Sequence, residues 1–179
     1  GESTMRKWIT CTIMAVMMAA MIFMGTGNNV FADDEVTYDS NMQTKKFDVN
    51  VKVGKDGSYT VTENIKVKFV NPRHGIYRYI PYKGNVVTID KNGGQKKLLY
   101  YADFDLLKND SNTDLQEDSD GNSEVLQFGS EDYTVNEGNY KFTYQLIPQY
   151  QGDTFDYLYY NIFPTLWRNN IPKGSTFTI

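Results

Sequence analysis

Apolar and polar side chains alternate along much of the chain after about residue 45. In a β-strand this period of two places successive side chains on opposite faces. One face of the first segment carries Phe47, Val49, Val51 and Val53. After a turn at 54–57 that contains two glycines, the same period links Tyr59, Val61, Glu63, Ile65, Val67 and Phe69. The pattern predicts an antiparallel hairpin.

Further short extended segments follow. We predict strands at 76–81, 86–89, 98–101, 124–128, 140–146 and 175–179, and leave 103–107 open. A nearly wholly polar stretch, 109–123, reads as a solvated loop, and Gly138-Asn139 reads as a turn. The aromatic stretch 155–163 suits either a strand or a helix. Many short strands without an amphipathic helical window predict an all-β fold, an antiparallel β-sandwich of the immunoglobulin-like or a related kind.

The N-terminal region has the pattern of a secretory signal peptide. Arg6 and Lys7 precede an apolar run that reaches Met24, and Ala32 precedes an acidic stretch. An uncleaved membrane anchor is the alternative. We therefore predict a leader remnant and signal peptide at 1–32, a flexible leader at 33–44 and a single extracytoplasmic domain at 45–179. The strand-like end at Ile179 suggests the N-terminal part of a longer protein.

Cysteine content and charge narrow the class of protein. Cys11 is the only cysteine and lies within the predicted signal peptide, so the exported chain would have no disulfide, as is common in Gram-positive secretion. Arg6, Lys7 and Glu2 leave with the signal peptide, which changes the net charge from −4 to −5. An acidic chain argues against nucleic-acid binding, which needs a basic surface.

Several motifs together resemble a known family. They are Val61-Thr62-Glu63 after the turn at 54–57, the segment His74–Pro81 (HGIYRYIP), Gly138-Asn139-Tyr140 and Trp167. With this spacing the chain resembles the extracytoplasmic N-terminal domain of bacterial predicted membrane proteins catalogued as domain of unknown function 2207. The resemblance covers roughly residues 45–179. It implies a signal peptide, one β-rich domain outside the membrane, and membrane helices downstream, but no catalytic activity.

Glu63 is the most unusual residue of the pattern, because its register places a carboxylate among apolar side chains. An unpaired buried carboxylate costs several kcal/mol or takes up a proton. Arg78 also lies in an otherwise apolar segment, and its planar guanidinium suits a carboxylate. We predict a partly buried Glu63–Arg78 ion pair that fixes 74–81 against the sheet. The alternative is that Glu63 lies near a bulge and reaches water.

Other candidate residues carry weaker signals. His74 is the only histidine, and neither a metal set nor a Gly-x-Ser-x-Gly motif accompanies it, so we interpret it as a turn residue. The acidic run 114–124 does not fit the EF-hand spacing. Four aromatic residues are candidates for a binding surface, with core packing as the alternative: Tyr157, Tyr159, Tyr160 and Trp167. We predict no catalytic residue, no metal site and no cofactor.

These observations favour an extracytoplasmic binding or sensing module of a membrane-anchored protein. Its ligand would be a protein or an envelope polymer. A cell-wall carbohydrate-active enzyme is one alternative, and a cleft with two carboxylates about 5–10 Å apart would favour it. A purely structural stalk is another, and a flat surface without a pocket would favour that.

Overall fold

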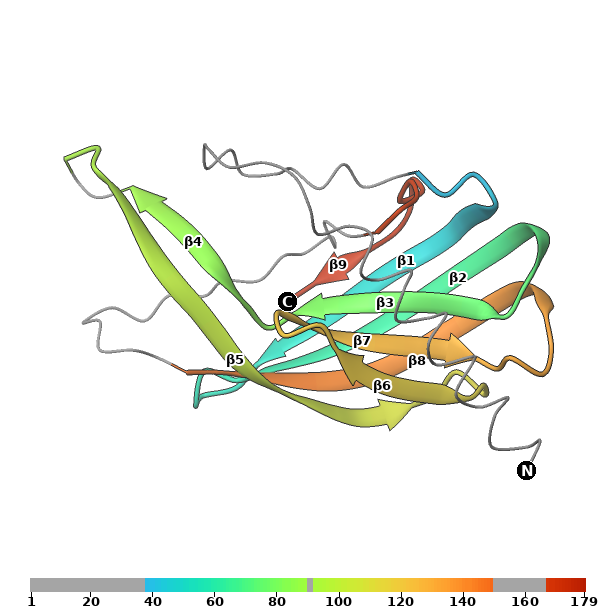
Figure 1. The fold of residues 1–179 in the computed structure, drawn as a ribbon. Coiled ribbons are helices and arrows are strands. Elements are labelled where there is room, and N and C mark those ends of the chain that lie inside the picture. Colours follow the sequence, from blue (N-terminus) through green and yellow to red (C-terminus); the bar gives the residue numbers. More distant parts are fainter. Residues whose placement is uncertain (1–37, 90–91, 150–166) are drawn as a thin grey trace, which may run out of the picture. The chain divides into compact units, whose positions relative to one another are not determined.

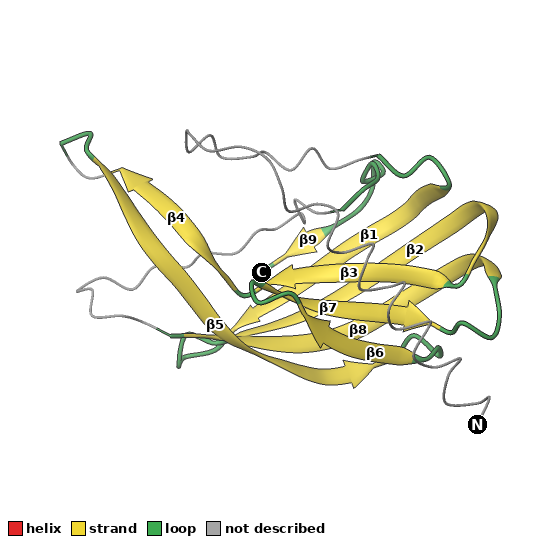
Figure 2. Ribbon diagram, viewed as in Figure 1, coloured by secondary structure: helices red, strands yellow, loops and turns green. Residues whose placement is uncertain are grey.

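The computed structural model describes residues 38–89, 92–149 and 167–179. The predicted signal peptide lies outside these ranges, as does the aromatic stretch 155–163. None of the described residues belongs to a helix long and apolar enough to cross a membrane. The strands, shown in Figure 2, are β1 (Met42–Val53), β2 (Tyr59–Arg73), β3 (Gly75–Pro81), β4 (Lys83–Ile89), β5 (Gln95–Asn109), β6 (Leu115–Ser119), β7 (Ser123–Gly129), β8 (Val135–Pro148) and β9 (Phe177–Thr178).

The strands form two sheets that pack face to face (Figure 1). The large sheet has the order β4-β5-β8-β2-β1-β9, and the small sheet has the order β3-β7-β6. All pairs are antiparallel except β1 with β9. The predicted all-β antiparallel sandwich is confirmed.

The predicted β1–β2 hairpin is present, with Val51 opposite Val61 in the register. Gly57 takes a φ of +81° in the turn, a conformation that glycine adopts without steric cost. The Asp56 carboxylate accepts hydrogen bonds from the backbone and hydroxyl of Ser58, which closes the turn. The predicted inward face is buried along β2. In β1 it is buried up to Val51, but Val53 lies at the strand end and is 47% exposed.

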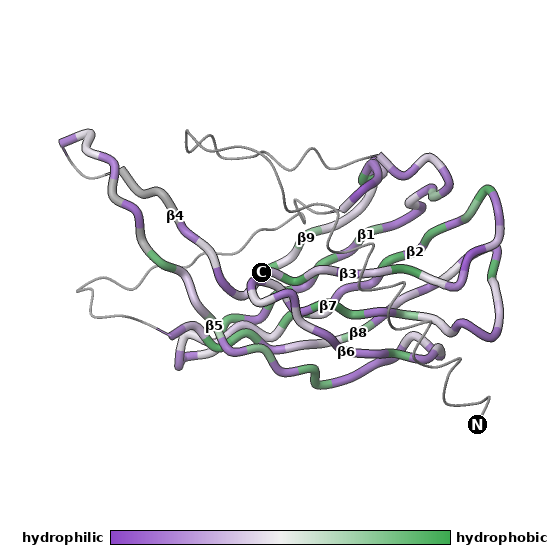
Figure 3. The backbone as a smooth tube through the Cα atoms, viewed as in Figure 1, coloured by the Kyte–Doolittle hydropathy of each residue, from purple (hydrophilic) through white to green (hydrophobic). Residues whose placement is uncertain are grey.

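The core lies between the two sheets and is rich in aromatic rings. Figure 3 shows apolar and polar positions alternating along the strands that enclose it. In β8 the predicted inward residues are all buried: Tyr140, Phe142, Tyr144 and Leu146. Phe142 packs against Phe128 of β7 with ring centroids 4.9 Å apart, so the contact joins the two sheets. Full burial of one such side chain stabilises the fold by roughly 1.5–3 kcal/mol.

The predicted turn at Gly138-Asn139 and the predicted loop at 109–123 are wrong, because strands occupy both segments. β8 runs straight through Gly138-Asn139, where we expected a turn. A Cβ atom at Gly138 would lie 2.4 Å from the Tyr140 ring, so the glycine makes room for that ring. The predicted loop 109–123 contains β6, which pairs on one edge with β7 and on the other with none of the described strands. Its side chains are mostly solvent-exposed, which suits the polar composition that suggested a loop.

Strand boundaries near residue 72 also differ from the prediction. β2 continues through Asn71 and Pro72, and only His74 separates it from β3. The register between β2 and β8 shifts between Lys68 and Arg73, so Pro72 lies where no ladder hydrogen bond is needed. β1 also begins earlier than predicted. It starts at Met42, inside the segment predicted as a flexible leader.

Candidate functional site

Glu63 of β2 and Arg78 of β3 meet between the two sheets. Arg78 Nε donates to Glu63 Oε2, and Nη2 donates to Oε1, both at 2.8 Å. The Tyr144 hydroxyl donates a third hydrogen bond to Oε1 at 2.9 Å. Glu63 is 0% and Arg78 3% exposed. The carboxylate is thus fully paired in the interior, and the pair holds the sheets together without facing a ligand.

The binding-surface candidates have different outcomes. Tyr157, Tyr159 and Tyr160 lie outside the described residues. Trp167 is buried, and its ring meets Phe47 edge-on with centroids 5.2 Å apart. Its indole Nε1 donates to Thr44 Oγ1 at 2.9 Å. These contacts are those of a core residue, so Trp167 supports a site rather than presenting an open surface.

A hollow of about 100 Å³ lies where β2 ends and β1 begins. It is bounded by β3 on one side and by the segment after residue 166 on the other. Its lining consists of Asp39, Met42, Arg73, Ile76, Tyr77, Tyr79, Trp167 and Arg168. It has the size of one small chemical group, and it joins segments far apart in the sequence.

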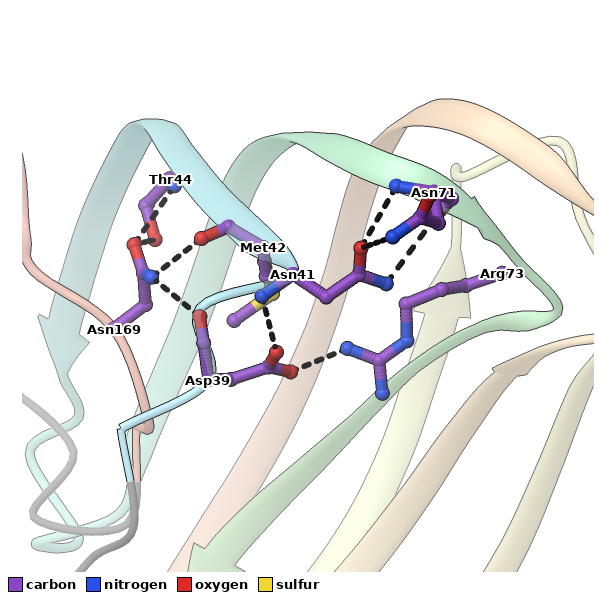
Figure 4. Close-up of polar contacts among 7 residues, drawn as sticks. All are labelled: Asp39, Asn41, Met42, Thr44, Asn71, Arg73 and Asn169. Carbon is purple, nitrogen blue, oxygen red and sulfur yellow. Dashed lines mark hydrogen bonds and ion pairs between the residues drawn. The ribbon is translucent and has the colours of Figure 1, made fainter.

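Asn169 fastens the C-terminal side of this hollow to the N-terminal side (Figure 4). Its Nδ2 donates to the carbonyls of Asp39 at 3.1 Å and Met42 at 2.6 Å. Its Oδ1 accepts from the backbone and hydroxyl of Thr44, both at 3.0 Å. Thr44 also accepts a hydrogen bond from Trp167, so these contacts hold residues 167–169 against the start of β1 and fix one wall of the hollow.

A second group of contacts fixes the end of β2 (Figure 4). The Asn41 Oδ1 atom accepts from the Asn71 backbone at 2.7 Å, and Asn41 Nδ2 donates to the Asn71 carbonyl at 3.2 Å. Nearby, Arg73 Nη1 forms an ion pair with Asp39. The Arg73 guanidinium also lies over the Phe69 ring, 5.6 Å from its centroid. Asp39, the only carboxylate among the described residues of the lining, is therefore neutralised within the fold.

The segment after the hollow is held along β1. The Phe47 backbone donates to Ser175 Oγ at 3.0 Å, and the Thr176 backbone donates to Asp48 at 3.0 Å. Burial alone would raise the pKa of the Asp48 carboxyl. Hydrogen bonds from Lys46 and Thr176, together with the Lys46 charge, nevertheless lower this pKa below its usual value. Asp48 thus stays ionised and keeps the C-terminal segment on the sheet.

The chemical character of the hollow comes from Arg168 and two tyrosines. Arg168 is exposed, and within the described ranges its guanidinium has no hydrogen bond or ion pair. Tyr77 is 54% exposed and Tyr79 is half-buried. An arginine and tyrosines that line one hollow suit an anionic group attached to an apolar or sugar-like body. Asp39 is paired with Arg73, so the described part of the lining offers no free carboxylate for catalysis.

His74 adjoins a second, more open hollow of about 310 Å³. Its Nδ1 lies 3.0 Å from the Ser130 carbonyl and 2.8 Å from the Tyr133 carbonyl. Since carbonyls only accept, Nδ1 carries the proton, and this contact ties the β2–β3 turn to the β7–β8 loop. The described residues contain no group of three side chains suited to a metal ion.

Sequence reasoning missed most of this site. The residues that build it are Asp39, Asn41, Asn71, Arg73, Arg168 and Asn169. These residues are polar and of types common in loops, so they do not stand out in the sequence. Asn169 also lies 130 positions from Asp39, so no local pattern links the two. The one signal was the local density of Asn, Asp and Arg beside predicted strand ends. That density indicates a capped turn as readily as a binding site.

Taken together, the fold and the hollow define an all-β sandwich domain with a small polar and aromatic site at one end. The model of the family described as predicted membrane protein (DUF2207) N-terminal domain matches residues 43–176. The chain belongs to this family, as the motifs of the sequence indicated. Comparison with curated proteins and with solved structures found no match.

Proposed function

We propose that this chain is the extracytoplasmic binding module of a membrane protein. Its ligand is an anionic envelope polymer, which it holds at the hollow between β3 and residues 167–168. The observation that carries the proposal is that the exposed residue Arg168 lines the same hollow as Tyr77 and Tyr79. A phosphate or carboxylate group of the polymer would pair with Arg168, and its sugar or polyol body would lie against the rings.

The framework around the hollow supports binding because it is already assembled. Asn169 and Thr44 fix one wall, and the Asn41–Asn71 contacts fix another. Arg73 is oriented by Asp39. A site whose side chains are held in place loses little conformational entropy when a ligand binds.

The enzymatic alternative finds no support at this site. A glycoside hydrolase needs two carboxyl groups about 5–10 Å apart, one of them free to donate a proton. Among the described residues, Asp39 is the only carboxylate in the lining of the two hollows, and Arg73 pairs with it. The stalk alternative predicted a flat surface, whereas this end of the domain is hollowed.

Isothermal titration calorimetry with poly(glycerol phosphate) tests the proposal, with dextran as the neutral polymer. We expect the purified chain to bind the phosphate polymer and not dextran. Arg168→Gln should weaken binding about tenfold or more, the effect of losing one charge-assisted hydrogen bond. Tyr77→Ala should weaken it as well.

Lys66→Gln is the matched control, because it removes one positive charge from the exposed outer face of the large sheet. If Lys66→Gln weakens binding as much as Arg168→Gln does, the attraction is a general charge effect and the hollow is not the site. Binding of dextran with equal affinity would also contradict the proposal.

A further inference from the structure

The β4–β5 hairpin differs from the rest of the domain. β5 pairs with β8 only from Ala102 onward, while its first half pairs with β4. The hairpin 83–101 is called the arm here, and its paired strands, 83–89 and 95–101, continue beyond the sandwich (Figure 1). Because the arm lies outside the two packed sheets, at least one of its faces is not covered by the rest of the domain.

One face of the arm is both apolar and cationic. Lys83 pairs with Tyr101 and Asn85 pairs with Leu99, so these side chains share a face with Lys97. Leu99 is 46% and Tyr101 37% exposed, and both lysines are exposed. Leucine and tyrosine flanked by lysines form the composition that binds at a lipid–water interface.

Charge is segregated along the chain in a way that singles out the arm. The arm contains four lysines and one aspartate, whereas residues 102–148 contain eleven acidic and two basic side chains. An anionic surface would attract the arm and repel the strands that follow it. Each lysine near such a surface adds to the attraction.

The arm starts at the end of the sandwich where the described chain ends. β9 runs parallel to β1, with Thr178 beside Asn50, so the chain reaches Ile179 near the β1–β2 turn. β8 is antiparallel to β2 and also ends there, and Ala102 at the base of the arm pairs with Pro148 of β8. The β1–β2 turn, the end of β8 and the base of the arm therefore lie at the same end of the sandwich.

We propose that the arm face formed by Lys83, Asn85, Lys97, Leu99 and Tyr101 docks on the anionic lipid surface of the bilayer. The lysines contact lipid phosphates, and Leu99 and Tyr101 enter the boundary between headgroups and acyl chains. This contact would set the orientation of the domain relative to the membrane. It is independent of the ligand proposed for the hollow.

Tryptophan fluorescence with brominated lipids tests the contact directly, because bromine quenches only an indole that enters the bilayer. The full chain carries Trp8→Phe throughout, and buried Trp167 provides a constant reference. The test variant is Leu99→Trp, and the control is Val70→Trp, since Val70 is 61% exposed on β2. Vesicles contain phosphatidylcholine alone or equal parts phosphatidylcholine and phosphatidylglycerol.

With the anionic vesicles we expect the emission of Leu99→Trp to fall by about half and that of Val70→Trp to stay constant. Adding Lys83→Glu and Lys97→Glu should abolish the quenching, while Lys66→Glu with Lys68→Glu should leave it intact. The apolar run at the N-terminus is common to all these variants. It therefore cannot produce the differences between them.

Several results would overturn the proposal: no quenching of Leu99→Trp, equal quenching of Val70→Trp, or no effect of the two arm lysines. A response of Leu99→Trp to soluble glycerol phosphate without vesicles would also overturn it, since it would indicate a phosphate site instead of a lipid surface. Circular dichroism shows whether each variant is folded. The Leu99→Trp and Val70→Trp pair decides the matter even if the lysine variants do not fold.

Discussion

Arg78 and Glu63 join the two sheets through a pair of parallel hydrogen bonds, with Arg78 in the small sheet and Glu63 in the large one. Phe47 lies beneath the guanidinium, 5.9 Å away at its ring centroid, and the Tyr144 hydroxyl completes the coordination of the carboxylate. Charges taken out of water in this way are stable only as a complete set.

Removing one member of this pair should therefore destabilise the domain more than removing both. We expect Arg78→Met or Glu63→Leu alone to lower the free energy of unfolding by about 3–5 kcal/mol, because each leaves a buried charge unpaired. The double variant should lose less than either single one. Urea unfolding followed by circular dichroism measures all three. A double variant as unstable as the sum of the two singles would show that the charges are not coupled.

Trp167 and Thr44 should be coupled through the indole hydrogen bond. Trp167→Phe keeps a ring against Phe47 but loses the donor, and Thr44→Val loses the acceptor. In a double-mutant cycle we expect a coupling energy of about 1 kcal/mol, the usual net value of a neutral hydrogen bond. Additive losses would mean that the bond contributes nothing to stability.

Gly75 and Gly129 should not tolerate a side chain. They pair across β3 and β7, and a Cβ atom at Gly75 or Gly129 would lie 1.7 Å or 1.8 Å, respectively, from a backbone carbonyl oxygen of the facing segment. Their φ angles, +144° and +128°, also disfavour other residues. We expect Gly75→Ala or Gly129→Ala to cost well over about 3 kcal/mol, at the upper end of measured single substitutions.

Gly121→Ala is the control for these glycines. Gly121 has a φ of +87°, but no heavy atom lies within 4 Å of the position that a Cβ atom would take there, so only the backbone penalty applies. We expect a cost of about 1–2 kcal/mol for it. Thermal unfolding distinguishes the cases, and equal losses at Gly75 and Gly121 would show that the close approach has no energetic consequence.

Glu124 should make the domain less stable at neutral pH. Burial, together with the charges of Glu117 and Asp118, raises the pKa of the Glu124 carboxyl. A carboxyl whose pKa is higher in the folded chain than in the unfolded chain favours folding when protonated, so its cost appears as the pH rises through the unfolded and then the folded pKa.

Glu124→Gln should therefore raise the free energy of unfolding at pH 7 by a few tenths of a kcal/mol, roughly the size of an exposed charge contact. The gain should vanish at a pH below the usual range of a glutamate pKa, where the wild-type carboxyl is protonated in both states. Urea midpoints at the two pH values measure it. A gain that is the same at both would assign the effect to packing instead of charge.

The sequence predicted the structure best where buried and exposed side chains alternate with the period of a β-strand. From Tyr59 to Phe69 in β2 and from Tyr140 to Leu146 in β8 every second residue is buried, so the alternation revealed both strands and their inward faces. The same regularity made Glu63 conspicuous and pointed to Arg78, because a carboxylate at a buried position needs a partner of opposite charge. Gly138 and the polar β6 escaped this reasoning, since neither departs from what a turn or loop would contain.

By itself, then, the sequence determined the fold class, the β1–β2 hairpin, the inward faces of the long strands and the family. These follow from local patterns, because a strand exposes its side chains alternately wherever it lies. Only the tertiary structure decided the strand order, the hollow between Asp39 and Arg168, and the extension of the arm. Such features depend on contacts between segments up to 130 residues apart, and no local pattern records which distant polar groups will meet.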